Sequence, residues 1–111
     1  MAIFSTHLLN SIDGTHASDV EIIIHKVNNK NKVVFLEDKT DSSGRMLKEF
    51  ELTKEDCESD YEMIIYTGNY FNYSSEIVNE ISIKFNMKDP QKKYHMPLII
   101  SPNGYSIWWS N

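Results

Sequence analysis

Four histidines are the residues of this chain with the most evident chemical potential: His7, His16, His25 and His95. Their spacing matches no compact zinc pattern, and no metal site is expected. The single cysteine, Cys57, stands among carboxylates that disfavour a thiolate, so it is predicted to be an inert loop thiol. The chain has neither a Gly-rich phosphate loop nor a Gly-x-Ser-x-Gly elbow. Any catalysis is therefore expected to depend on histidine.

Two of the histidines, His7 and His95, fall inside predicted strands, where an ionisable residue needs a reason. His16 is predicted to be a loop residue and His25 a solvent-facing strand residue, both without a functional role. For each histidine taken alone, an ordinary surface or hydrogen-bonded side chain is the favoured interpretation. Two near-neutral histidines beside an arginine could instead activate water and stabilise an oxyanion. The sequence leaves open whether they meet.

The C-terminal stretch 94–111 predicts the hairpin that positions His95. Two apolar runs flank Ser101-Pro102-Asn103-Gly104, where proline fixes φ and Asn-Gly tolerates positive φ. The alternation of a strand places Tyr94, Met96, Leu98 and Ile100 on one face. That face is thick and apolar and belongs in a core, so His95 is predicted to lie on the outer surface of its sheet.

The rest of the chain supplies the other strands. Short runs of β-forming residues, separated by turn residues, occupy 3–9, 20–27, 32–40, 46–52, 61–67 and 80–87. Residues 53–60 are a charged stretch, and 68–77 is the only segment with a plausible helical pattern. We therefore expect an all-β fold, an eight-strand antiparallel sandwich with one short helix, as a single domain over residues 1–111.

Composition narrows the partners. The 111 residues carry a net charge of −5 without a basic stripe, which argues against nucleic acid. No apolar run is long enough for a membrane span or a signal peptide, so a soluble, cytoplasmic protein without membrane partners is expected.

Five short motifs together resemble the transthyretin-like proteins, and among them the 5-hydroxyisourate hydrolases. The resemblance spans nearly the whole chain in order, and its last two blocks are the most distinctive. The motifs are Ser5-Thr6-His7-Leu8-Leu9, Ser43-Gly44-Arg45, the run 66–71, the run 94–102 and Gly104-Tyr105-Ser106.

The resemblance implies a fold, an assembly and an activity. Each subunit of that family is an eight-strand sandwich, and four subunits surround a central channel that holds the active sites. The catalytic residues of the family match His7, Arg45 and His95 of this chain. No metal or organic cofactor is implied. The implied reaction is hydrolysis of 5-hydroxyisourate, in urate degradation, to 2-oxo-4-hydroxy-4-carboxy-5-ureidoimidazoline.

The C-terminal tail departs from the family pattern. Family enzymes end in Tyr-Arg-Gly-Ser, whereas this chain ends in Trp108-Trp109-Ser110-Asn111, and Lys93 stands where the family often has a further histidine. Substrate contacts are expected from Trp108, Ser106 and Asn111. Because the indoles replace a phenol, two alternatives stay open: hydrolysis of a different cyclic amide, or a non-catalytic protein that binds a small ligand.

Overall fold

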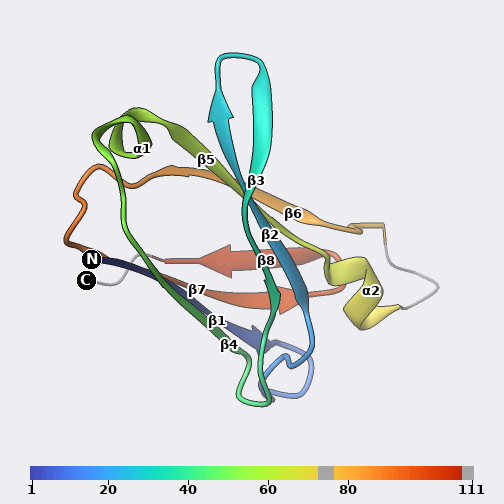
Figure 1. Ribbon diagram of the computed structural model, residues 1–111. Helices are drawn as coiled ribbons and strands as arrows, with labels where there is room; N and C mark the ends of the chain where they lie inside the picture. Colours follow the sequence, from blue (N-terminus) through green and yellow to red (C-terminus); the bar gives the residue numbers. More distant parts are fainter. Residues whose placement is uncertain (73–76, 109–111) are drawn as a thin grey trace.

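The computed structural model describes residues 1–72 and 77–108, which form two four-stranded sheets packed face to face (Figure 1). The elements in chain order are β1 (Ala2–Asn10), β2 (Glu21–Asn28), β3 (Asn31–Lys39), β4 (Arg45–Phe50), α1 (Lys54–Glu58), β5 (Asp60–Ile65), α2 (Thr67–Phe71), β6 (Ile81–Asn86), β7 (Lys93–Ser101) and β8 (Gly104–Ile107). The first sheet has the strand order β4-β1-β7-β8 and the second β3-β2-β5-β6. The predicted eight-strand sandwich is confirmed.

Two details of the predicted fold are wrong. The charged stretch forms a second short helix, α1, because Thr53 and Asp56 cap it reciprocally through side chain and backbone. Cys57 therefore lies half-buried on a helix and not in a loop. The sandwich is also not wholly antiparallel, since β1 and β7 pair in parallel. Parallel pairing is possible here because the chain passes through the second sheet between these two strands.

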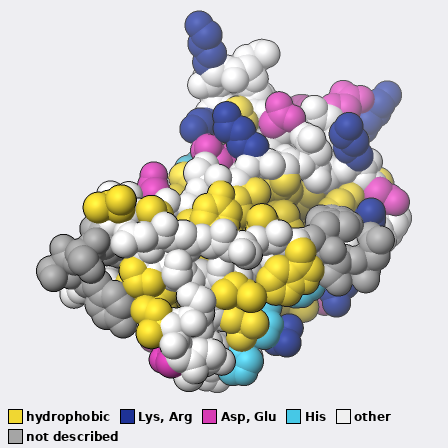
Figure 2. Space-filling model, turned by 180° about the vertical axis from the view of Figure 1, so that it is seen from behind, with side chains coloured by type: hydrophobic (Ala, Val, Ile, Leu, Met, Phe, Trp, Pro, Cys, Tyr) yellow, Lys and Arg dark blue, Asp and Glu magenta, His cyan; other side chains and the backbone are white. Residues whose placement is uncertain are grey.

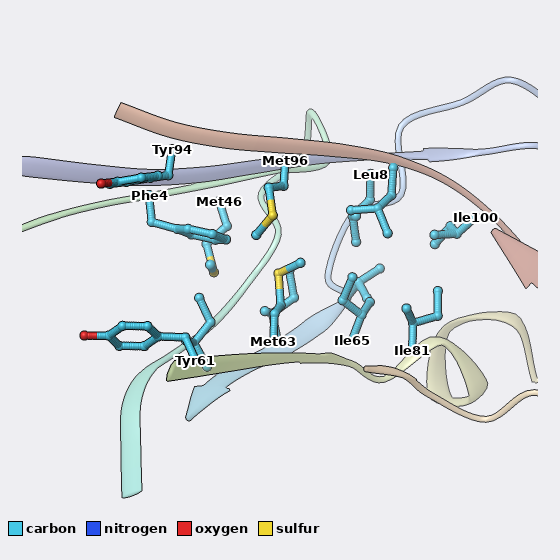
Figure 3. Close-up of a cluster of buried hydrophobic side chains, with 14 of the residues drawn as sticks. Phe4, Leu8, Met46, Tyr61, Met63, Ile65, Ile81, Tyr94, Met96 and Ile100 are labelled. Carbon is cyan, nitrogen blue, oxygen red and sulfur yellow. The ribbon is translucent and has the colours of Figure 1, made fainter. Parts of the chain in front are cut away.

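The apolar faces of the two sheets meet in one core, drawn in Figure 3. From the first sheet Phe4, Leu8 and Met96 point inward, and Met63 and Ile65 of the second sheet face them. Each such side chain, when fully buried, stabilises the fold by about 2 kcal/mol. Because one face of β7 is buried in this core, its alternate residues, His95 among them, must point outward, as predicted.

The helices of the described ranges 1–72 and 77–108 are too short to cross a bilayer. Both consist of five residues and lie at the ends of β5.

Candidate active site

The three predicted catalytic residues lie on the outer face of the first sheet. Arg45, the first residue of β4, is directly opposite His7 of β1. Ser5, two residues before His7 and so on the same side of the strand, is directly opposite His95 of β7. Paired residues of neighbouring strands share a face, so the sheet brings His7, Arg45 and His95 to one surface.

A tight turn holds Arg45 at the start of β4. The Asp41 carboxylate accepts hydrogen bonds from the backbone N–H of Ser43 (2.9 Å) and of Arg45 (3.0 Å), and from the Ser43 hydroxyl (2.8 Å). These bonds, with the one from Arg45 first in importance, lower the pKa of Asp41 and keep it ionised. The turn is therefore fixed by its own side chain.

Gly44 lets this turn pack against β1. Its φ is +73°, a left-handed conformation that glycine adopts without strain. A Cβ atom at this position would lie 2.5 Å from the Leu8 carbonyl oxygen and 3.2 Å from Cβ of His16. Only glycine allows the turn, β1 and the segment around His16 to come this close.

His95 is oriented by a serine that the sequence analysis did not single out. Ser5 Oγ lies 2.8 Å from His95 Nδ1, which leaves Nε2 as the other ring nitrogen. Burial first, and then the charges of Lys93 and Arg45, lower the pKa of His95 below its ordinary value of 6.5. His95 is therefore neutral at pH 7. The strand period places Ser5 on the same face as His7, but it does not show that the residue beside Ser5 is His95.

His7 has an unexpected neighbour in His16. Nε2 of His7 lies 2.9 Å from Nδ1 of His16, and the ring centroids are 5.1 Å apart with 28° between the ring planes. Burial, then the charge of Arg45, then His16 lower the pKa of His7, so it too is neutral at pH 7. The prediction that His16 is a plain loop residue missed this contact. Nothing in the spacing of the two histidines indicates it, because the loop between them sets the geometry.

A pocket of about 200 Å³ opens on this face beside His95. Its lining comes from three strands and consists of Ser5, Thr6, Arg45, Met46, Leu47, Lys93 and His95. The lining includes two cations, Arg45 and Lys93, and neither forms an ion pair with any residue in the described part of the chain. In the view of Figure 2, histidine side chains on the lower part of the molecule adjoin hydrophobic and basic ones. Such a pocket suits a small anionic or carbonyl-rich ring.

Comparison with known proteins places these observations in a family. Residues 4–109 match the HIUase/Transthyretin family. The chain belongs to this family. A 5-hydroxyisourate hydrolase of Salmonella dublin is 30% identical over 108 residues, which are 96% of this chain and 79% of that protein. A 5-hydroxyisourate hydrolase of Halalkalibacterium halodurans is 25% identical over 111 residues, which are 94% of this chain and 93% of that protein.

Solved structures agree on the fold of this family member. The 5-hydroxyisourate hydrolase of Klebsiella pneumoniae superposes with a TM-score of 0.79 at 22% identity, over all of both chains. Transthyretin of Sparus aurata superposes with a TM-score of 0.80 at 17% identity, over 96% of this chain and 95% of its own.

Ser106 and Trp108, the described residues predicted to contact substrate, lie on the same sheet face as the pocket. Ser106 is directly opposite Ile99, and the backbone N–H of Trp108 donates to the Pro97 carbonyl at 3.4 Å. Neither Ser106 nor Trp108 lines the pocket beside His95. Their predicted substrate contacts therefore stay predictions, and Asn111 lies outside the described residues.

Side chains of the types that can bind metals do not form a cluster of three in the described residues. Within residues 1–72 and 77–108, no group of three or more His, Cys, Asp or Glu side chains is placed to hold a metal ion.

Proposed function

We propose that this protein hydrolyses 5-hydroxyisourate to 2-oxo-4-hydroxy-4-carboxy-5-ureidoimidazoline. The observation that carries the proposal is the joint presence of neutral His95 and unpaired Arg45 at one pocket on the outer sheet face. The names of its relatives in Salmonella and Halalkalibacterium support the substrate. A neutral imidazole beside a fixed cation suits the attack of water on a carbonyl.

In the proposed mechanism, His95 is the general base. Its Nδ1 is engaged by Ser5, so Nε2 is the nitrogen that accepts a proton from the attacking water. The water oxygen bonds to the ring carbonyl carbon, and the carbonyl electrons move onto oxygen, where the Arg45 guanidinium stabilises the negative charge. The carbonyl then reforms as the ring C–N bond breaks, and the proton held by His95 passes to the departing nitrogen. The product carries a new carboxyl group.

His7 is proposed to orient the bound ring. It faces Arg45 across the strand pair, so a ring held by the guanidinium lies beside this imidazole. Because His7 is neutral at pH 7, it does not repel Arg45, and its flat ring can pack against the bound ring. Fixing the ring next to the activated water lowers the entropic part of the barrier.

We further propose that the outer face of the first sheet is the interface of a homotetramer, with the sites in a central channel. Large apolar side chains are exposed there: Leu47 at 54%, Ile99 at 38% and Trp108 at 45%. Such a surface is typical of an interface between subunits, and assembly would enclose the shallow pocket. In this proposal the enzyme acts in the cytoplasm, as the sequence predicts.

The test is an ultraviolet time course with freshly generated 5-hydroxyisourate. The unaltered protein, His95→Gln and His25→Gln are compared at equal concentration, because His25 is a strand histidine of the other sheet. We expect the unaltered protein and His25→Gln to remove the substrate band well above the spontaneous rate, and His95→Gln to lose about 100-fold or more of this rate. Decay at the spontaneous rate with the unaltered protein would refute the proposal.

The same samples test the two alternatives. One outcome is that the unaltered protein leaves 5-hydroxyisourate intact and hydrolyses another cyclic amide with the same dependence on His95. In that case the proposed substrate is wrong and the proposed site is right. If no cyclic amide is hydrolysed and a ligand quenches tryptophan fluorescence, the scaffold is a binding protein.

Sedimentation velocity tests the proposed tetramer independently of activity. We expect Leu47→Glu to dissociate it.

A further inference from the structure

The contact between His7 and His16 joins an outer strand position to the loop that follows β1. The loop is held against the strand on both sides of His16: a bridge pairs it with Leu9, and the N–H of Ala17 donates to the Leu8 carbonyl at 2.9 Å. The backbone of His16 is thus anchored to β1, while its side chain stays exposed. With Nε2 of His7 and Nδ1 of His16 at 2.9 Å, the rings are at hydrogen-bond distance.

A hydrogen bond between two neutral imidazoles ties their tautomers together. One nitrogen of the contact must carry the hydrogen and the other must present its lone pair. The proton on the remaining nitrogen of each ring is then fixed as well. A rotation or tautomer change of His7 alone would break the bond, so His16 restricts what His7 can present to a bound ring.

The charges around His7 oppose its protonation. Arg45 of β4, His16 of the loop and His95 of β7 all oppose protonation of His7, and only a hydrogen bond with the Ser43 backbone favours it. The surroundings of His7 therefore favour its neutral form, whose single N–H is the group that the contact with His16 can hold in place.

We propose that His16 is a positioning residue of the active site, which holds the His7 ring in one orientation and one tautomer through the contact between its Nδ1 and Nε2 of His7. This role rests on the proposed function, because it acts through His7 on the bound substrate. Nothing in the sequence pattern and no family motif quoted above includes His16. Its effect is expected on the chemical step.

Three variants separate the hydrogen bond from the ring. His16→Phe keeps a flat ring and removes the nitrogens. His16→Asn places a polar atom near the position of Nδ1, whereas His16→Gln places one nearer to Nε2. Because His16 is exposed, none should unfold the chain, and a thermal melt of each variant checks this. His25→Gln again serves as the control.

Two readouts are needed, of which the first is independent of activity. The ring ¹⁵N chemical shifts of His7, which distinguish its two tautomers, are measured by NMR at pH 8 on the unaltered protein and on His16→Phe. We expect a single tautomer of His7 in the unaltered protein and a mixture of both in His16→Phe. The same tautomer state of His7 in the two proteins would overturn the proposal, whether or not the protein hydrolyses 5-hydroxyisourate.

The second readout is the steady-state kinetics with 5-hydroxyisourate. We expect His16→Phe and His16→Gln to lose about tenfold in kcat with KM little changed, and His16→Asn to retain most of the rate. Full activity of His16→Phe would refute the positioning role. A single tautomer of His7 that depends on His16, in a protein without hydrolase activity, would instead refute the proposed function and leave the contact intact.

Discussion

The outer faces of the two sheets use charge in opposite ways. On the second sheet, Glu62 is 7% exposed, accepts from Lys32 at 2.9 Å and from the Ser82 hydroxyl at 2.8 Å, and so is fully engaged. On the first sheet, Arg45 and Lys93 border a pocket without an acidic partner in the described ranges. Paired charges stabilise a fold, whereas cations kept apart from carboxylates are available to a ligand.

The strand histidines of the two faces sharpen this contrast. His95 has Ser5 at its Nδ1, supplied by the neighbouring parallel strand. His25 lies opposite Glu62, yet that carboxylate is taken by Lys32 and Ser82, and Nδ1 of His25 is buried without a hydrogen-bond partner among the described residues. A histidine on an outer strand face is therefore not sufficient for a site. The groups directly across from it decide its role.

The largest expected effect is the loss of Arg45. Arg45→Ala removes the cation that stabilises the developing oxyanion, and kcat/KM should fall about 100- to 1000-fold. Steady-state kinetics with 5-hydroxyisourate measure this. Arg45→Lys should recover only part of the rate, because an ammonium lacks the planar two-donor fork of a guanidinium.

Lys84→Ala is the matched control for Arg45, since it removes a cation from the hollow on the second sheet. Its kcat/KM should equal that of the unaltered protein. An equal loss in both variants would mean that general electrostatic attraction, and not the first-sheet pocket, drives the reaction.

Two glycines with the same backbone conformation provide the next test. Gly44 has φ +73° and no room for a Cβ, whereas Gly14 has φ +74° and open space around it. Gly44→Ala should destabilise the fold by about 3 kcal/mol, from left-handed strain together with overpacking against Leu8. Gly14→Ala should cost only the strain, about 1 kcal/mol. Urea unfolding of both variants measures the difference, and equal costs would show that the turn can shift away from β1.

The sequence predicts the faces of single strands and the C-terminal hairpin. It does not predict which distant strands pair with each other. The alternation of apolar residues in 94–100 is enough to place His95 outward, and Asn103-Gly104 is enough to predict the hairpin. Parallel pairing of β1 with β7 is not encoded in either strand alone, so the contact between Ser5 and His95 could not be foreseen. The contact between His7 and His16 depends on a loop whose path has no periodic signal.

Helix α1 was missed for a different reason. Its five residues show no amphipathic repeat, and the capping box uses Asp56 where glutamate or glutamine is usual. Charge density was read as a loop, although Lys26 of β2 pairs with Asp56 at 2.6 Å and fixes the helix to the sheet. This ion pair between distant parts of the chain stabilises a helix that the local sequence pattern does not predict.

A smaller effect is expected from the paired charges of the second sheet. Glu62→Gln removes an almost buried carboxylate from Lys32 and Ser82. The free energy of unfolding should fall by about 1 to 2 kcal/mol. This value is in the lower part of the range for charged hydrogen bonds, because Lys32 is half-exposed. Activity should not change. Glu37→Gln, at an exposed position of β3, is the control and should leave stability unaltered.

The pH dependence of this contribution has a defined sign. The hydrogen bonds from Lys32 and then Ser82 lower the pKa of Glu62 in the folded state below its ordinary value of 4.5. The stabilisation is therefore complete above pH 4.5 and is lost as the pH falls through the lowered pKa. Acid unfolding of Glu62→Gln should begin from a lower stability but show a weaker dependence on pH than that of the unaltered protein.

The smallest expected effect concerns Lys93, the second cation of the pocket. Its charge is, after burial, the main cause of the lowered pKa of His95. Lys93→Gln should raise that pKa toward 6.5, so the acid limb of kcat/KM moves to higher pH. Because Lys93 is exposed to solvent, its charge is screened, and we expect a loss of about two- to threefold at pH 6 and none at pH 8. A loss that is the same at both pH values would instead assign Lys93 to direct binding of the substrate.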